Sequence, residues 1–454
     1  MSKPIGIGLA GFGTVGAGVY KNLQRNGALL EQRIGTTFEV KKIAVRDLSK
    51  ARDVQAPASL FTTNPDEILG DPSIQIVVEL MGGIDVPLAF VKKAIAAGKI
   101  VVTGNKALLA EHGNEIFELA REKRVPVFYE AAVAGGIPII KSVREAFVGN
   151  RFEAIHGILN GTSNYILSRM TGEGLDFAPV LAEAQKLGYA EADPALDING
   201  WDAAHKAIIL ASLAYGFWID PKDVLVEGIE KVTAADIRFA EELGYRIKLI
   251  ASIKADESGA IEVRVVPTLI PKSHVLASVN GVFNAVAVKG DVVGEALFYG
   301  RGAGQDPTSS SVLGDLAEAA AFLESPRQSV GFTAHSLYGP SKPIDDTISK
   351  YYLRLGVEDR PGVLAQIAGT LAKADIGILS VIQPEGLHCC GYYIASRNAG
   401  GFLHALQVKA TSLTHGLALF RIRFTAGIFK HSQQMITCVY SAFNILELKT
   451  VLFH

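Results

Sequence analysis

The turn between the first strand and the first helix constrains this fold most strongly. The segment IGIGLAGFGTVGAGVYKNLQ passes from an apolar strand into Gly11, Gly13 and Gly16, spaced as G-x-G-x-x-G, and then into a helical pattern. In dinucleotide-binding folds the first glycine allows a tight turn, the second lets the backbone approach a pyrophosphate, and the third lets helix and strand pack closely. A glycine-rich turn that binds nothing shares this pattern, so the motif predicts either a cofactor turn or a packed turn.

Strand and helix patterns alternate after this turn. Strands are predicted at 38–47, 74–80, 99–104 and 125–130, and helices at 86–97 and 106–123. This alternation predicts a doubly wound parallel sheet of the Rossmann type, in which ligands bind beyond the carboxyl ends of the strands. The segment TGNKALLA places Thr103 and Lys106 there as candidate contacts. Lys106 could equally be a solvated lysine in the first turn of a helix.

The second predicted strand ends in Arg46 and Asp47. This position meets the adenine ribose in dinucleotide folds, where an arginine suits the 2′-phosphate of NADP and an acid suits the free 2′-hydroxyl of NAD. The adjacent pair therefore slightly favours NADP and leaves NAD open.

Length, charge and cysteine content exclude several classes of protein. A chain of 454 residues predicts two or three domains, and 44 basic against 46 acidic residues predict neither a nucleic-acid nor a membrane partner. No uncharged apolar run is long enough to cross a membrane, which predicts a soluble, cytoplasmic protein. All three cysteines follow residue 388, so the main body can hold no cysteine nucleophile.

Three polar or irregular segments follow the predicted sheet. AAVAGGIPII, from residue 131, predicts buried irregular backbone whose carbonyls either hold a cation or simply pack tightly. At 160–162, Asn-Gly-Thr predicts a polar pocket wall or an ordinary turn with an N-cap. In EADPALDINGWDAAHK, Asp202 and Lys206 are one helical turn apart on an otherwise apolar helix.

Such a helix is expected to be buried, and a buried lysine beside an acid suits proton transfer. Alternatively, Asp202 and Lys206 form an ordinary ion pair on the protein surface. The preceding residues, 191–200, are predicted to be a loop, from which Glu191 and Asp193 are expected to reach the same cavity and receive an ammonium group. Beside a nicotinamide fold, this arrangement predicts hydride transfer at a carbonyl carbon of an amino-acid-like substrate.

Six motifs, in the same order, resemble homoserine dehydrogenases of the monofunctional type that carries a C-terminal ACT domain. They are GFGTVG, TGNKALLA, YEAAVAGGIPII, GILNGTSNYIL, YAEADPALDINGWDAAHK and GRGAGQDPTSSSVLGDL. The resemblance covers about residues 4–386. It implies NAD(P)-dependent interconversion of L-aspartate 4-semialdehyde and L-homoserine, on the route to threonine, methionine and isoleucine.

The resemblance also implies roles for single positions. Lys206 matches the proton donor, with Lys106 near nicotinamide and substrate as the rival donor. Glu191 and Asp202 match acids that contact homoserine. The cofactor positions beside the three glycines and Thr103 are Phe12, Thr14, Val15, Arg46, Gly188 and Gly302. The positions that match a sodium site of mainly main-chain oxygens are Glu130, Val133, Gly135 and Ile137.

The expected domains follow from these motifs. Residues 1–130 are expected to form the NAD(P)-binding domain, to which a helix near 310–325 returns, and residues 131–310 an α+β catalytic and dimerisation domain. A linker is expected at 326–348 and the first half of an ACT-like regulatory module at 349–386. The family implies a homodimer or homotetramer, and the module allows either a threonine effector or dimerisation alone.

Residues 387–454 depart from the rest of the chain. They hold one acidic residue, Glu447, together with all three cysteines. We interpret them as an atypical tail that is either out of frame or divergent, and reading codons 380–400 in all three frames distinguishes the two. A second function class also stays open here: a non-enzymatic amino-acid sensor built from a nucleotide fold and an ACT module.

Overall fold

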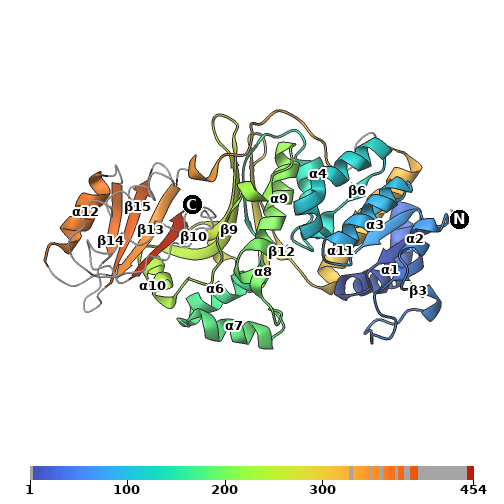
Figure 1. The fold of residues 1–454 in the computed structure, drawn as a ribbon, viewed down its shortest axis with the longest axis horizontal. Coiled ribbons are helices and arrows are strands. Elements are labelled where there is room, and N and C mark those ends of the chain that lie inside the picture. The colour runs from blue at the N-terminus through green and yellow to red at the C-terminus, as the bar shows by residue number, and fades with distance from the viewer. Residues whose placement is uncertain are drawn as a thin grey trace. The chain divides into compact units, whose positions relative to one another are not determined.

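The computed structural model describes residues 4–326, 331–346, 349–356, 361–373, 377–382, 389–396 and 447–453 (Figure 1). Its contacts divide the chain into two compact units. Residues 1–161, 205–221 and 282–339 form the first unit, and residues 162–204, 222–281 and 340–454 form the second. Each unit therefore draws on three separate segments. The domain boundaries expected at 130 and 310 stay a prediction.

The first unit contains the predicted parallel sheet. Its strands are β1 (Ile5–Ala10), β2 (Phe38–Ala44), β3 (Phe61–Thr62), β4 (Ile76–Glu79), β5 (Ile100–Thr103) and β6 (Val127–Phe128). They lie in the order β3-β2-β1-β4-β5-β6, and every neighbouring pair is parallel. The order reverses between β1 and β4, which is the point where ligands bind in such sheets. The Rossmann-type prediction is confirmed.

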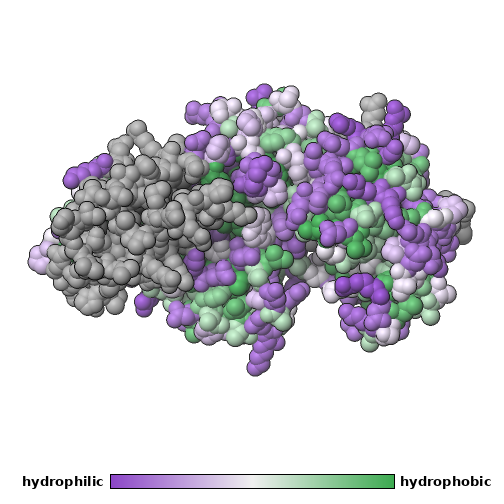
Figure 2. Space-filling view, viewed as in Figure 1, coloured by the Kyte–Doolittle hydropathy of each residue, from purple (hydrophilic) through white to green (hydrophobic). Residues whose placement is uncertain are grey.

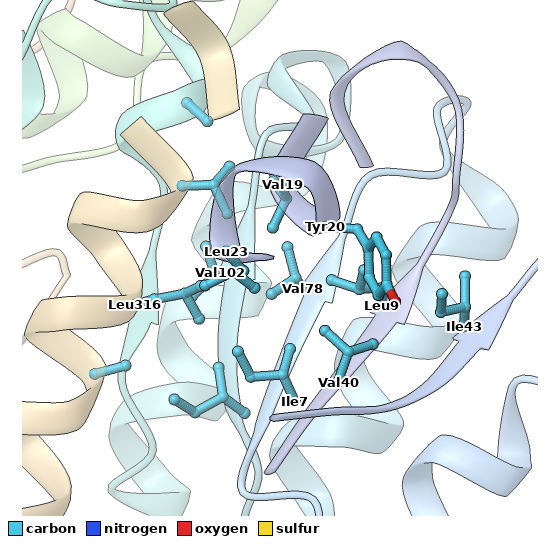
Figure 3. Close-up of a cluster of buried hydrophobic side chains, with 14 of the residues drawn as sticks. Ile7, Leu9, Val19, Tyr20, Leu23, Val40, Ile43, Val78, Val102 and Leu316 are labelled. Atoms are coloured by element: carbon cyan, nitrogen blue, oxygen red, sulfur yellow. The ribbon is translucent and has the colours of Figure 1, made fainter. Parts of the chain in front are cut away.

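Helices cover this sheet and bury its apolar side chains. They are α1 (Thr14–Ile34), α2 (Asp66–Gly70), α3 (Asp85–Ala96), α4 (Lys106–Lys123) and α11 (Gln305–Glu324). Figure 3 shows Leu316 of α11 beside Leu23 of α1 and Val102 of β5. Leu316 and Val102 are fully buried, and such a side chain stabilises the fold by about 1.5–3 kcal/mol. α11 thus completes the core although it lies far along the chain.

The rest of the first unit begins with the 3-10 turn η2 (Glu130–Ala132), the short helix α5 (Ile139–Lys141) and the π turn η3 (Ser142–Ala146). Three antiparallel strands follow, with β11 (Phe283–Gly290) between β7 (Phe152–Ile158) and β12 (Gly294–Arg301). Helix α9 (Trp201–Tyr215) contributes its residues from His205 onward.

The second unit is built on the long antiparallel pair β9 (Tyr245–Ala255) and β10 (Ile261–Pro271), with the short strand β8 (Leu225–Val226) parallel to β10. Its helices are α6 (Gly161–Glu173), α7 (Phe177–Lys186), α8 (Ala195–Ile198) and α10 (Ala234–Glu242). Helix α8 corrects the expectation that residues 191–200 are loop alone. Asp193 accepts a hydrogen bond from the Ala195 amide at 3.1 Å, which fixes the turn into α8.

The sheet that contains β9 and β10 continues within this unit toward the C-terminus, where Thr268 and Leu269 of β10 pair in parallel with Leu452 and Phe453. Strands β13 (Ser349–Gly356) and β14 (Gly377–Ile382), with helix α12 (Val363–Lys373) between them in the chain, lie where the sequence predicts a strand, a helix and a second strand. That they form an ACT-like module stays a prediction. The sheet also contains β15 (Cys389–Ser396) and β16 (Glu447–Phe453) in the order β16-β13-β15-β14. Its described strands therefore extend beyond the boundary expected at residue 386. Residues 397–446 lie outside the described part of the chain.

No helix within the described ranges is long and apolar enough to span a bilayer. On the face shown in Figure 2, hydrophobic residues form small patches among hydrophilic ones.

Candidate functional site

The glycine turn after β1 has three glycines in three different environments. Gly11 has φ +105°, and a Cβ there would lie 2.4 Å from the Leu80 carbonyl oxygen. A Cβ on Gly16 would lie 2.2 Å from the Gly11 carbonyl oxygen, so this contact requires glycine. A Cβ on Gly13 would meet nothing within 4 Å. The turn is therefore tight at Gly11 and Gly16 and open at Gly13.

The N-terminus of α1 follows this opening. Its N-cap is Gly13, which supplies no capping side chain, and its first turn has no acidic residue. The first amides of a helix lack intrahelical acceptors and carry positive partial charge, so this end can bind an anion. Thr14 is exposed, whereas the Phe12 ring is buried edge-on against Tyr20 and Phe61. Phe12 can therefore contact a cofactor only through its main chain.

The two charged residues after β2 differ in what they bind. Both are exposed, but Asp47 Oδ1 accepts hydrogen bonds from the Ser49 amide and hydroxyl at 2.8 and 2.7 Å. The Ser49 hydroxyl, followed by the Ser49 amide, lowers the pKa of Asp47. Asp47 is thus engaged in a local turn, and this favours Arg46 as the group that meets a cofactor.

The ends of β4 and β5 carry a buried polar cluster. Thr103 is fully buried, and its hydroxyl donates to Glu79 Oε2 at 2.7 Å. Asn105 caps α4 by accepting from the Leu108 amide at 3.1 Å, and Lys106 is the half-buried first residue of that helix. Thr103 therefore supports this edge of the sheet through its hydroxyl.

Lys206 lies on a buried helix, as its apolar surroundings predict. It is 7% exposed, and its Nζ donates to the Leu159 carbonyl oxygen at 2.6 Å, just after β7. Asp202, one turn earlier on α9, is 5% exposed. The surface ion pair is thus excluded as the reason for this spacing.

One cofactor candidate, Gly188, and one substrate candidate, Glu191, belong to the second unit. Gly188 has φ +74° just after α7, and Glu191 is an exposed residue of the following loop. The Thr162 hydroxyl donates to the Tyr189 carbonyl oxygen at 2.7 Å, which ties the start of α6 to this loop. Whether Gly188 and Glu191 meet Lys206 at one site stays a prediction.

The segment from Glu130 to Ile137 has the irregular buried backbone that its sequence predicts. Ala134 and Gly135 both have positive φ, at +55° and +46°. A Cβ on Gly135 would lie 2.4 Å from the Gly302 carbonyl oxygen, so the candidate cation position at Gly135 and the candidate cofactor position at Gly302 are neighbours. No group of three metal-binding side chains occurs among the described residues. An ion here would therefore rely on main-chain oxygens.

The Glu130 side chain already accepts hydrogen bonds from two main-chain amides. Its two carboxylate oxygens accept from the amides of Ile140 and Lys141 at 2.9 and 2.8 Å, where α5 begins. Burial raises the pKa of Glu130 to about 7. This carboxylate therefore stabilises a helix start, and the main-chain oxygen is the part of Glu130 that suits a cation.

Three buried polar residues were missed by the sequence reasoning. Asp315 on α11 accepts from the Glu130 amide at 3.0 Å, and burial raises its pKa. Asn284 on β11 lies against Gly302, and neither of its amide atoms has a hydrogen-bond partner in the described structure. Glu79 is the third. Single polar residues inside apolar runs were the available signal, but Thr103 and Glu130, the partners of Glu79 and Asp315, lie far away from them in the sequence.

Two family profiles match the chain. One, described as the NAD-binding domain of homoserine dehydrogenase, matches residues 11–130, and the other, described as homoserine dehydrogenase, matches residues 138–317.

Curated relatives agree with these profiles. A homoserine dehydrogenase of Pseudomonas aeruginosa is 48% identical over 388 residues, covering 84% of this chain and 89% of the relative. One from Neisseria gonorrhoeae is 47% identical over 390 residues, covering 84% and 88%.

Solved structures are also similar. The crystal structure of a homoserine dehydrogenase from Thiobacillus denitrificans is 41% identical, with a TM-score of 0.86 and coverage of 100% of this chain and 98% of that one. A hyperthermophilic archaeal homoserine dehydrogenase in complex with NADPH is 27% identical, with a TM-score of 0.60 and coverage of 72% and 100%.

Proposed function

The chain belongs to the homoserine dehydrogenase family, and from this membership we propose how its own residues carry out the reaction. It is an NAD(P)-dependent oxidoreductase that interconverts L-aspartate 4-semialdehyde and L-homoserine. The bound nicotinamide supplies or accepts the hydride. The protein must therefore hold both molecules and manage one proton at the substrate oxygen.

Lys206 is the proposed proton donor to the carbonyl oxygen. The observation that carries this assignment is a lysine ammonium placed on a buried helix, 7% exposed, against a neutral carbonyl oxygen. A lysine ammonium beside the substrate oxygen can donate the proton that this oxygen takes up on reduction. Lys106, half-buried at the start of α4, is the alternative donor.

Glu191 and Asp202 are the proposed contacts for homoserine. Homoserine and the semialdehyde both carry an ammonium group, which carboxylates bind through charge-assisted hydrogen bonds. The place of Asp202 supports its part in such a contact, because it is 5% exposed and lies one helical turn from Lys206, the proposed proton donor.

The cofactor is proposed to bind at the carboxyl edge of the parallel sheet. Its pyrophosphate would meet the open backbone at Gly13 and the free amides of α1, with Gly188 and Gly302 as further backbone contacts. We favour NADP over NAD, because Asp47 is engaged by Ser49 while Arg46 is exposed at the strand end. An arginine there suits a 2′-phosphate.

A monovalent cation, sodium in the first instance, is proposed at the main-chain oxygens of Glu130, Val133, Gly135 and Ile137. Two successive residues of positive φ turn this backbone sharply inside the protein, and oxygen ligands suit a hard cation. The ion would hold this segment beside Gly302, and no step of the reaction is assigned to it.

Assembly and regulation are proposed from the family pattern. A homodimer or homotetramer is supported by β12, on which Leu297 and Tyr299 are 46% and 55% exposed. A second copy of the chain would cover such side chains. Strands β13 to β16 together with α12 support an ACT-like module, for which threonine is the proposed effector.

Replacing each lysine by alanine tests the assignment of the proton donor. We expect Lys206→Ala to lower kcat about 10²- to 10⁴-fold, the usual contribution of a general acid, with a much smaller rise in KM. Lys106→Ala should lower kcat less than Lys206→Ala does. Lys123→Ala, at the exposed last turn of α4, is the matched control and should behave as wild type. A near-normal kcat in purified Lys206→Ala enzyme would overturn the assignment.

A further inference from the structure

A carboxylate without an ion pair lies at the end of β4. Glu79 is fully buried, and its Oε1 accepts from the Met81 amide at 2.8 Å while its Oε2 accepts from the Thr103 hydroxyl at 2.7 Å. Both donors are neutral, and no salt bridge to Glu79 occurs in the described ranges. Burial raises the pKa of Glu79, and its hydrogen bonds partly offset this rise.

The hydrogen bonds of Glu79 belong to a closed circuit. The Thr103 oxygen accepts from the Asn105 amide at 3.0 Å, and the Asn105 side chain donates to the Gly83 carbonyl oxygen at 2.8 Å. The chain segment from Gly83 back to Met81 closes the circuit. The circuit therefore fastens the loop after β4 to the turn after β5 at two points.

Both fastened segments border the proposed cofactor site. The loop after β4 begins at Leu80, whose carbonyl oxygen lies against Gly11 of the glycine turn. The turn after β5 leads directly into Lys106 at the start of α4. A displacement of either segment would therefore move the wall of the glycine turn or the lysine.

Stability alone does not account for an acid here. Removing a carboxylate from water costs several kcal/mol unless its oxygens are well satisfied, and a neutral or apolar residue avoids this cost. Only a carboxylate, however, can accept a hydrogen bond on both oxygens at once. The circuit needs two acceptors, one toward each segment.

We propose that Glu79 is a positioning residue of the cofactor site, whose two carboxylate oxygens hold the loop at 80–83 and the turn at 103–106 in register and thereby place Lys106. This inference rests on the proposed assignment of the glycine turn and Lys106 to cofactor and substrate. Glu79 acts through these segments and does not itself touch the reacting atoms.

The isosteric variant Glu79→Gln tests the proposal. Glutamine offers one acceptor oxygen, so one of the two segments loses its acceptor while the buried charge disappears. We expect the dissociation constant for NADPH to rise about tenfold and kcat/KM to fall by roughly tenfold to a hundredfold, because small misplacements are costly in active sites. The thermal midpoint should equal or exceed that of wild type.

The control is Glu39→Gln, which makes the same chemical change at an exposed acid of β2 that pairs with Lys41. It should leave NADPH affinity and kcat/KM unchanged. A lowered thermal midpoint in Glu79→Gln with normal NADPH affinity and kcat/KM would show a purely structural role and overturn the proposal. Wild-type behaviour in all three measurements would overturn it as well.

Thr103 supplies a second test if Glu79→Gln does not fold. Thr103→Ser keeps the hydroxyl and should retain NADPH affinity, whereas Thr103→Val removes it and should weaken NADPH binding about tenfold. Equal affinity in these two variants would contradict the circuit. The role of Lys106 is tested separately. A normal kcat in Lys106→Ala would remove Lys106 from the reaction, whereas the NADPH affinity of Glu79→Gln would still test whether Glu79 positions the loop at 80–83.

Discussion

Gly13 and Gly16 are required for different reasons. An added Cβ has open space at Gly13 and no space at Gly16. Gly13 has φ −78°, which any residue adopts, and an added Cβ would meet nothing within 4 Å. The fold therefore does not require glycine at this position. At Gly16 the backbone of Gly11 leaves no room for a Cβ.

Two alanine variants test this distinction. We predict that Gly13→Ala folds with a normal thermal midpoint but binds NADPH at least tenfold more weakly, because its methyl group blocks the approach of the pyrophosphate. Gly16→Ala should lower the thermal midpoint, since overpacking costs about 1–3 kcal/mol. Differential scanning fluorimetry and NADPH titration measure both effects. Tight NADPH binding by Gly13→Ala would rule out a close pyrophosphate.

At the scale of elements, strand β9 is joined to helix α6 by a buried lysine. Lys248 is 2% exposed, and its Nζ donates to Asn164 Oδ1 of α6 at 3.0 Å and to Asn280 Oδ1 at 3.1 Å. All its acceptors in the described structure are neutral oxygens, and burial lowers its pKa to about 7. The charged form is therefore disfavoured in the folded protein.

This burial predicts a pH dependence of stability. The pKa of Lys248 is about 7 when folded and 10.5 at its ordinary value, so between these pH values the unfolded chain binds more protons. The contribution of Lys248 to the free energy of unfolding therefore increases as pH rises from 7, and it is lost as pH falls through 7. Urea unfolding at pH 7 and pH 9 measures this change. Lys248→Met should show a smaller increase than wild type, and an equal increase would exclude Lys248 as its source.

The elements that the sequence predicts well are those with local signals. Glycine spacing and strand–helix alternation predict β1, β2, β4, β5 and β6 because each signal lies within a few residues. The two-residue strand β3 was missed because it is too short to show an alternating pattern. The short helix α8 was missed because one turn of helix has no periodicity. The burial of Lys206 was predictable from the apolar residues around it on α9. The Glu79–Thr103 and Glu130–Asp315 contacts were not, because they join residues 24 and 185 positions apart.

At the scale of the whole molecule, the strands near the C-terminus are joined to the rest of the second unit by an ion pair. Arg354 Nε on β13 lies 2.7 Å from Asp236 Oδ1 on α10, with side chains 9% and 1% exposed. Asp236 also closes a capping box with Thr233 at the start of α10. A change at β13 therefore affects helix α10 of the same unit.

Removing one member of this pair should be strongly destabilising. We predict that Arg354→Met lowers the free energy of unfolding by about 3 kcal/mol, because it leaves a buried acid without its cation. The double variant Arg354→Met/Asp236→Asn should recover part of this loss. Chemical denaturation of wild type, the two single variants Arg354→Met and Asp236→Asn, and the double variant measures the coupling. Additive losses would mean that the two side chains do not act as a pair.

The whole chain is expected to catalyse hydride transfer between NADPH and L-aspartate 4-semialdehyde. The most direct measurement follows the loss of nicotinamide absorbance when the purified protein is mixed with both compounds. We predict oxidation of NADPH that requires the semialdehyde and yields L-homoserine. Binding of NADPH without semialdehyde-dependent oxidation would contradict the claim and would favour the non-enzymatic sensor.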